Sequence, residues 1–399
     1  YLLDIKNPDE AFSLAQYQKD VNKIAFHVQN PFSWATAGTG IPGGTVDDAA
    51  ANASTGEVYV ATHGTGYGVH RWDGTSWSTV SGVTDQPYCV VVDSAGNVYA
   101  GTDNGGLYGK RAGESSFTFL GRDTVGGTTN HTHYTFDLAV DGAGHIYTAP
   151  SSYEHPYPDK PFYGALSRWA PSSHYRRDVT SGGWTSRAPL PSPAVGGWHT
   201  VIGDGAGNLY ALSGSYTDGR FWRYDAATDA WSEPTRPYNG FAFKHLIAAG
   251  DNIFALGHSS SAWGELWNLY SHTVGGSNWS LLGATPLSAG ADAQAGLTGA
   301  WDGGDYIYVL EGSGHSIFRR YQISTNNWET LSTPSSALTF SYGPALARAG
   351  SYLYAYGTAG TGLTTNLYRY GKVGIPETRL TITGSALVAP LGAATPAWT

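Results

Sequence analysis

The segment DGAGNLYALSG, residues 204–214, shows most clearly how this chain folds. A short Asp- and Gly-rich turn leads into alternating residues with an aromatic at Tyr210, which is typical of a tight β-hairpin. Related hairpins occur six more times along the chain. Their aligned aromatics are Tyr59, Tyr99, Tyr147, Phe254, Tyr308 and Tyr354. Consecutive aromatics are 40 to 63 residues apart, and this spacing predicts a repeat of small β-sheets.

Each hairpin is followed by an alternating strand, such as FWRYD at 221–225, and then by a short strand that opens with an aromatic residue. These opening aromatics are Trp77, Phe117, Trp184, Trp231, Trp279 and Trp328. The seventh repeat ends before an aromatic of its own, and Trp34 in the segment 31–35 matches the missing residue. The sequence therefore predicts an all-β fold, a seven-bladed β-propeller of four-stranded blades whose last blade is closed by an N-terminal strand.

The ring is expected to form one domain over residues 31–371, with an extension at 1–30 and a tail at 372–399. The extension contains a candidate short helix at 11–21 and a candidate strand at 23–28. Both terminal pieces have two interpretations. They pack on the rim of the ring, or they are strands donated to a neighbouring molecule in a self-assembly.

Composition narrows the function classes. Of 399 residues, 54 are Gly and only 13% are charged, which disfavours long helices and disorder. No apolar run is long enough for a transmembrane helix. The net charge of −9 disfavours nucleic acid as a partner. A single cysteine, Cys89, and the absence of Met suit an oxidising exterior, so we expect a secreted or cell-surface protein.

Two segments of the fourth repeat carry a family resemblance. ALSG at 211–214 and RYDAATDAW at 223–231 resemble the kelch repeat of β-propellers. The double glycine that follows the second strand of kelch repeats is reduced here to Ser-Gly, Leu-Gly or Glu-Gly. The resemblance implies the propeller fold and covers the ring.

The histidines gather on one face of the predicted ring. If the first strand of each blade runs from a face called top, both its entry and the end of the second strand lie on that face. Eight of the 13 His residues fall at these places. They are His63, His131, His133, His155, His199, His245, His258 and His315. The top mouth of the central channel is therefore the predicted site.

The entries to the first strands overhang the channel. Tyr88 and His199 each precede the aromatic of their own hairpin by the same number of residues. His245 precedes its aromatic by fewer residues, and it matches them when its shorter hairpin is taken into account. These residues are therefore expected at comparable places around the axis. Other predicted mouth residues are Cys89, His131, His133, Tyr134, Trp198, Lys244 and Tyr342. The alternative is a solvated loop surface without chemistry.

A long insertion between Tyr147 and Tyr210 is expected to lie over the top of the third blade. It includes Tyr153 in the Pro- and aromatic-rich stretch 151–164, and the pair Arg176 and Arg177. Aromatic rings suit stacking on sugars, and Arg suits a carboxylate. A rim loop that packs on its neighbour is the alternative.

The first functional hypothesis is a polysaccharide lyase that cleaves uronic-acid glycans by β-elimination. The reaction needs a base, an acid and a group that neutralises a carboxylate. The segment His131-Thr-His-Tyr-Thr-Phe-Asp137 resembles the entry strand of propeller lyases that degrade ulvan and related uronides. On this hypothesis we expect His133 or His199 as base, with His245 as a further candidate, Tyr134 as acid, and Lys244 or Arg176 as neutraliser. Tyr88, Tyr342, His131, Trp198, Arg177 and Tyr153 would contact the substrate.

Two other classes stay open. A non-catalytic carbohydrate-binding, adhesion or structural surface propeller would use the aromatic loops without turnover. A metal enzyme would hold a divalent ion on His131, His133, His199 and His245, because imidazole suits Cu, Zn or Mn.

Overall fold

The computed structural model describes a chain made of β-strands. The described residues are 2–5, 25–28, 34–103, 105–122, 133–140, 145–152, 167–169, 185–188, 200–204, 207–213, 220–234, 241–259, 267–282, 297–311, 317–332, 338–339, 345–350, 352–359 and 365–371. Within these ranges every regular element is a strand, which confirms the all-β prediction. The same ranges contain no helix long and apolar enough to cross a membrane.

Six sheets each contain four antiparallel strands that are consecutive in the chain, and we number them blades 1 to 6. Blade 1 contains β4 (Thr45–Ala51), β5 (Val58–His63), β6 (Gly68–Trp72) and β7 (Trp77–Val80). Blade 2 contains β8 (Pro87–Val92), β9 (Val98–Thr102), β10 (Gly106–Lys110) and β11 (Thr118–Arg122). Blade 3 contains β12 (His133–Val140), β13 (Ile146–Ser152), β14 (Ser167–Trp169) and β15 (Thr185–Ser186).

Blades 4 to 6 repeat the same order. Blade 4 contains β16 (Thr200–Gly203), β17 (Asn208–Ser213), β18 (Arg220–Asp225) and β19 (Ala230–Ser232). Blade 5 contains β20 (Phe241–Ala249), β21 (Asn252–Ser259), β22 (Trp267–Thr273) and β23 (Trp279–Leu282). Blade 6 contains β24 (Leu297–Trp301), β25 (Tyr306–Glu311), β26 (Ile317–Gln322) and β27 (Asn327–Leu331). The four-stranded antiparallel blade is therefore confirmed.

The last sheet, which we call the closing sheet, joins both ends of the ring sequence. It contains β28 (Leu338–Thr339), β29 (Ala345–Ala349), β30 (Tyr352–Ala359), β31 (Thr365–Tyr370) and β3 (Trp34–Gly38). Strand β3 pairs antiparallel with β31, so an N-terminal strand closes the last blade as predicted. The sheet has five strands rather than four because β28 and β29 both pair with β30, at different points along it.

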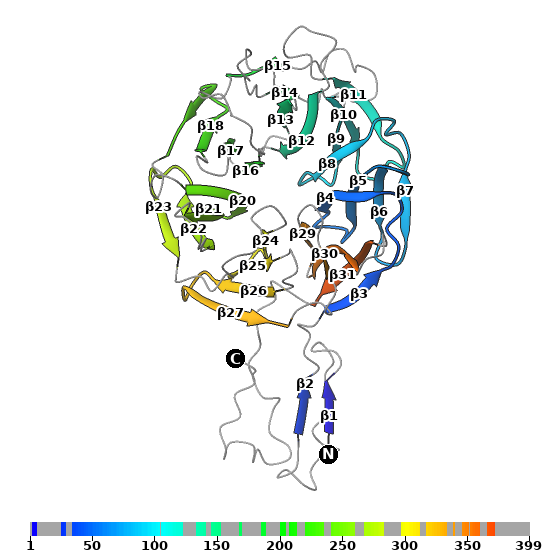
Figure 1. Ribbon diagram of the computed structural model, residues 1–399, viewed down its shortest axis with the longest axis vertical. Helices are drawn as coiled ribbons and strands as arrows, with labels where there is room; N and C mark the ends of the chain where they lie inside the picture. The colour runs from blue at the N-terminus through cyan, green and yellow to red at the C-terminus, as the bar shows by residue number, and fades with distance from the viewer. Residues whose placement is uncertain are drawn as a thin grey trace, which may run out of the picture.

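The innermost strands form a circle. Strands β4, β8, β12, β16, β20, β24 and β29 lie next to one another in that order, and β29 lies against β4. Figure 1 shows the resulting ring, with each blade running outward from the centre. Because the ring is closed, each innermost strand has a neighbouring blade on both sides, and each blade stabilises the next.

Buried aromatics explain why the repeats fold into blades. The hairpin aromatics Tyr59, Tyr147 and Tyr308 are at most 1% exposed, and they lie in clusters that reach into the neighbouring blade. The Trp that opens the outer strand pairs directly across the sheet with an aromatic ring on the third strand. The pairs are Trp72–Trp77, Tyr224–Trp231, His272–Trp279, Tyr321–Trp328 and Tyr370–Trp34. Their ring centroids lie 5.1–5.5 Å apart, within the range of favourable aromatic contacts.

Outside the ring, β1 (Leu2–Ile5) and β2 (Ala25–Val28) form a parallel two-stranded sheet. In Figure 1 this pair lies below the ring. The strand expected at 23–28 is thus confirmed, and the helix expected at 11–21 lies outside the described residues. The domain boundaries and self-assembly through residues 1–30 and 372–399 stay predictions.

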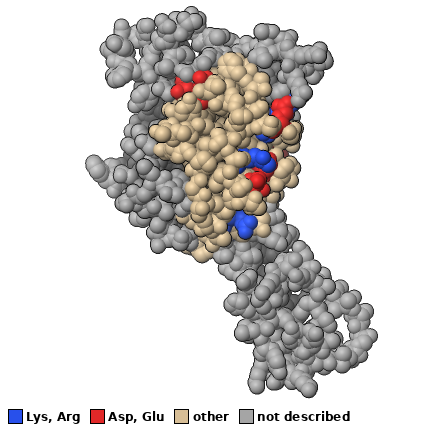
Figure 2. Space-filling model, turned by 90° about the vertical axis from the view of Figure 1, so that its right-hand side faces the viewer, with Lys and Arg blue, Asp and Glu red and all other residues tan. Residues whose placement is uncertain are grey.

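The side of the ring that contains blades 1 and 2 carries few charges. Figure 2 views the side of the ring at the right of Figure 1, and its charged side chains are scattered among uncharged ones. This agrees with the 13% of charged residues in the chain. Burial of aromatic and aliphatic side chains, rather than surface ion pairs, therefore holds the blades together.

Candidate functional site

The innermost strands share an irregularity near the end where the chain enters them. In β4, β8 and β20 the register with the second strand shifts at one residue, and these residues are Asp47, Tyr88 and Lys244. Beyond the shift, Asp48, Cys89 and His245 each pair with the residue two positions after the hairpin aromatic. A bulge of this kind re-aims the extra residue and is common beside functional sites. The bulged residues of blades 1, 2 and 5 are therefore equivalent.

This register corrects one part of the sequence alignment. His245 was expected at the place of Tyr88, but it pairs with Leu256 in the way that Cys89 pairs with Gly101. Lys244 occupies the place of Tyr88 instead. Residue counting missed this because the hairpin of blade 5 is one residue shorter than that of blade 2, whereas an alignment of His245 with Tyr88 needs a hairpin shorter by two.

His245 links two blades. Its Nε2 lies 3.1 Å from the carbonyl oxygen of Gly299 on the innermost strand of blade 6, and the N–H donates to that carbonyl. Burial lowers the pKa of His245, while the Gly299 carbonyl opposes this shift. The ring is therefore kept neutral at a blade junction, and its use as a base stays a prediction.

The other predicted residues divide into two groups. His133 and Tyr134 begin β12 and pair with Ser152 and Ser151, and Lys244 lies in β20. The structure describes the backbone of these three residues. Seven predicted residues lie outside the described ranges: Tyr153, Arg176, Arg177, Trp198, His199, His131 and Tyr342. The site assignments made for them stay predictions.

A cluster that joins the predicted residue Tyr88 to His63 and to Asp47, which was not predicted, lies at the top of blades 1 and 2. His63 Nδ1 donates toward the carboxylate of Asp47, with 2.8 Å and 2.7 Å to its two oxygens. The His63 ring stacks on Tyr88 with centroids 5.6 Å apart and 20° between the planes. The side chains of His63 and Asp47 are 27% and 15% exposed, so solvent reaches both. Sequence counting placed His63 on the top face, but only the bulge brings Asp47 to it.

Burial perturbs both carboxyl groups of this cluster. Desolvation raises the pKa of Asp47 to about 7, against the opposing effect of His63. It raises the pKa of Asp48 to about 6, although the backbone N–H groups of Val90 and Ala49 donate to that carboxylate. A carboxyl that titrates near neutrality beside an imidazole can exchange a proton, which is a common property of functional sites.

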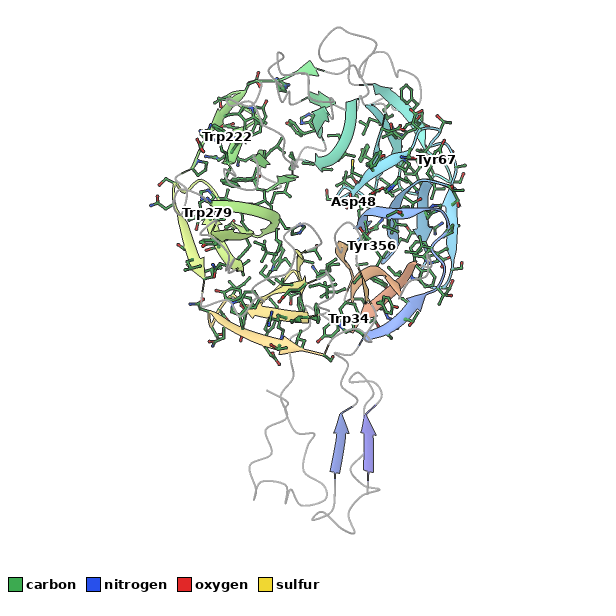
Figure 3. The ribbon with its side chains drawn as sticks, viewed as in Figure 1. Trp34, Asp48, Tyr67, Trp222, Trp279 and Tyr356 are labelled. Carbon is green, nitrogen blue, oxygen red and sulfur yellow. The ribbon has the colours of Figure 1, made fainter. Side chains whose placement is uncertain are left out.

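Tyr356 of the closing sheet lies beside these carboxyl groups. Burial, followed by the charges of Asp48 and Asp47, raises the pKa of Tyr356 well above its ordinary value. Its hydroxyl is buried and has no hydrogen-bond partner among the described residues. Figure 3 shows Asp48 and Tyr356 near the centre of the ring, where the first and last sheets meet.

Further out, the loop after β5 is tied to the entry of blade 2. The Tyr67 hydroxyl donates to the carbonyl of Thr84 over 3.1 Å, and Gly64 N–H donates to Gln86 Oε1 over 3.2 Å. Gln86 Nε2 in turn donates to the Tyr88 hydroxyl over 2.8 Å. Gly64 and Gly66 have φ angles of 85° and 75°, a conformation that favours glycine. These bonds fix the loop to the neighbouring blade.

A metal centre finds no support in the described part of the chain. No group of three His, Cys, Asp or Glu side chains is arranged there to hold an ion. His131 and His199 are not among those residues, so the predicted divalent site at His131, His133, His199 and His245 stays a prediction.

Comparisons with known proteins agree on the fold. No protein-family model and no curated protein matches the sequence. Among solved structures, an oligogalacturonate lyase in complex with manganese is 11% identical, with a TM-score of 0.59 over 85% of this chain and 91% of that chain. The Dos1 propeller is 12% identical, with a TM-score of 0.53 over 86% and 97%. U3-55K is 10% identical, with a TM-score of 0.54 over 82% and 95%. At these identities the likeness shows that this chain has a β-propeller fold.

Proposed function

We propose that the chain is a secreted or cell-surface, carbohydrate-active propeller that cleaves uronic-acid glycans by β-elimination at its top mouth. One observation carries the proposal. His133 and Tyr134 begin β12, Lys244 lies at the bulge of β20, and the strand between them, β16, begins directly after His199. Three consecutive blades thus contribute a base, an acid and a cation at one end of the ring.

The chemistry assigns one role to each residue type. A histidine, His133 or His199, takes the proton beside the carboxylate of a uronic-acid unit. Lys244 neutralises that carboxylate and stabilises the negative charge that develops on it. The electron pair of the broken C–H bond forms the new C=C bond, the bond to the neighbouring sugar oxygen breaks, and Tyr134 protonates the leaving oxygen. No outside oxidant or water is consumed.

The likeness to the oligogalacturonate lyase supports this function because oligogalacturonate is a uronic-acid glycan. The names of the Dos1 propeller and U3-55K indicate no reaction. The second candidate is therefore a propeller that binds glycans without turnover. The exposed ring of Tyr67, 42% accessible and fixed by its hydroxyl, favours glycan binding on either hypothesis.

The deciding experiment follows the unsaturated product. Polygalacturonate, alginate and ulvan are each incubated with the protein, and absorbance is recorded at about 235 nm, where the conjugated product of the proton abstraction absorbs. We expect a rising signal on at least one polymer, lowered about 100-fold in His133→Ala or His199→Ala.

His145→Ala is the matched control. His145 belongs to the same blade as His133, but it directly precedes β13 at the opposite end of β12. We expect this variant to retain the wild-type rate. No signal on any polymer would overturn the lyase proposal in favour of glycan binding, and equal losses in all three variants would show a folding defect instead of catalysis.

A further inference from the structure

We propose that the junction of blades 1 and 2 is a glycan subsite that binds an uncharged sugar unit. The junction surface consists of Asp47, His63, Tyr67, Gln86 and Tyr88. This inference deepens the proposed function, because it states which sugar lies next to the uronic acid. Its test measures binding rather than turnover, so that the two proposals can fail separately.

The aromatic rings of the junction surface suit a sugar face. Tyr67 is 42% exposed, although tyrosines elsewhere in the described blades are mostly buried. Its hydroxyl bond to the Thr84 carbonyl holds the ring in place across the blade boundary. Nearer the channel, Tyr88 and His63 are stacked and also come from different blades. In Figure 3, Tyr67 lies farther from the centre than Asp48, so the junction surface extends outward from the mouth.

The polar groups of the junction surface are fixed before any ligand arrives. Asp47 holds His63, and Gln86 is held by Gly64 N–H and by the Tyr88 hydroxyl. Glycan sites combine an exposed ring with a few oriented carboxyl and amide groups, because stacking covers the C–H face while hydroxyls form hydrogen bonds. Groups that are already oriented lose little entropy on binding. The surface therefore has the composition and the rigidity of a sugar site.

Charge selects the kind of sugar. Blades 1 and 2, residues 45–122, contain eight Asp and Glu residues and four Lys and Arg residues. The Arg71 guanidinium is paired with Glu57, 2.6 Å away. A uronate on the junction surface would lie next to the Asp47 carboxyl, which already holds His63. An uncharged sugar avoids this repulsion. The natural substrate would then be a mixed glycan, in which the uronate lies on the blades that carry Lys244 and a neutral unit lies here.

The test is calorimetric titration with defined hexasaccharides. Cellohexaose, xylohexaose and mannohexaose are the neutral probes, and hexagalacturonate is the charged probe. We expect at least one neutral probe to bind the wild-type protein. Tyr67→Ala should weaken that binding about tenfold, the effect of losing one stacked aromatic ring. Tyr67→Phe keeps the ring and should restore affinity to within about threefold. Hexagalacturonate binding should be the same in all three proteins.

Phe119→Ala controls for the loss of an exposed ring. Phe119 is 38% exposed and lies on β11, the outer strand of blade 2. This variant should bind the neutral probe as the wild type does. The inference is overturned if no neutral probe binds at millimolar concentration, or if Tyr67→Ala leaves the affinity unchanged. It is also overturned if Tyr67→Ala weakens hexagalacturonate instead. A missing elimination signal would overturn only the lyase proposal.

Discussion

Blades 1 and 6 fill the same two buried positions with different chemistry. In blade 1 the positions hold Thr62 and His70, and in blade 6 they hold Glu311 and Arg319. The equivalence follows from the register, since His70 and Arg319 each pair with the residue directly after the hairpin aromatic. Blade 1 thus uses neutral groups where blade 6 uses an ion pair.

In the neutral pair of blade 1, both ring nitrogens of His70 have a hydrogen-bond partner. The Thr62 hydroxyl lies 3.3 Å from the Gly68 carbonyl and 3.0 Å from His70 Nε2, and His70 Nδ1 lies 3.0 Å from the Thr79 hydroxyl. A proton on Nε2 donates to Thr62, and Nδ1 accepts from Thr79. Burial lowers the pKa of His70 to about 4, which keeps the ring neutral. This chain of hydrogen bonds needs no buried charge.

The ion pair of blade 6 is more sensitive to the loss of one partner than the neutral pair of blade 1. Arg319 Nη1 donates to Glu311 Oε1, and the two side chains are only 10% and 5% exposed. Burial lowers the pKa of Arg319 because the charged form loses hydration. A buried ion pair recovers its desolvation cost only while both partners are present. The two blades therefore show that the same buried positions accept either a neutral or a charged pair, and that only the charged pair depends on both charges being present.

Removing one charge of the pair should have the largest effect. Arg319→Met keeps most of the side-chain volume and takes the counter-charge from Glu311. We expect the free energy of unfolding to fall by about 3–5 kcal/mol, measured by denaturant titration. Arg71→Met is the control, because Arg71 is 38% exposed in its pair with Glu57 and should lose at most about 1 kcal/mol. Equal losses in both variants would contradict the comparison.

The second-largest effect is expected for the pH dependence of the free energy of unfolding that His70 of blade 1 causes. The pKa of His70 is lowered from 6.5 to about 4, so the unfolded chain binds the proton first. The contribution of the neutral His70 ring to the free energy of unfolding is fully present above pH 6.5, and it is lost as the pH falls toward 4. Asp47 and Asp48, whose pKa values are raised, act in the opposite direction.

The quantity to measure is therefore the difference in free energy of unfolding between wild type and His70→Gln. This difference should become smaller by about 2–3 kcal/mol between pH 7 and pH 4. A pH-independent difference would show that the ring is not kept neutral by burial.

The smallest change in the free energy of unfolding is expected when the residue pair of blade 1 is placed in blade 6. Glu311→Thr with Arg319→His places the pair of blade 1 in blade 6, where Thr330 already faces residue 319 as Thr79 faces His70. We expect the double variant to unfold within about 1 kcal/mol of wild type, because the neutral pair carries no ion desolvation cost. It should also gain the acid sensitivity of blade 1. A double variant as unstable as Arg319→Met would mean that the two positions are not equivalent.

The sequence predicted the frame of the molecule well and its site in part. The hairpin aromatics are periodic and buried, and the aromatics that open the outer strands are periodic too, so they marked the strands and the closure by Trp34. Asp47 was missed because its place depends on a bulge, and a bulge in β4 has no marker in composition. The hairpin of blade 5 is only one residue shorter than that of blade 2, so Lys244 rather than His245 has the register position of Tyr88. Contacts between blades, such as Asp48 with Val90, come from ring geometry that no local pattern encodes.

The pairing of β3 with β31 also sets the order in which the ring can be completed. Trp34 leaves the ribosome early, whereas its partner Tyr370 comes last among the paired residues of the ring. Until then the nascent chain carries β3 without its partner strand, and it can form individual blades but not the final one. Such distant pairing slows folding and leaves a strand edge exposed meanwhile. A chain that terminates before β31 would therefore lose the closure of the whole ring, and not only its last strand.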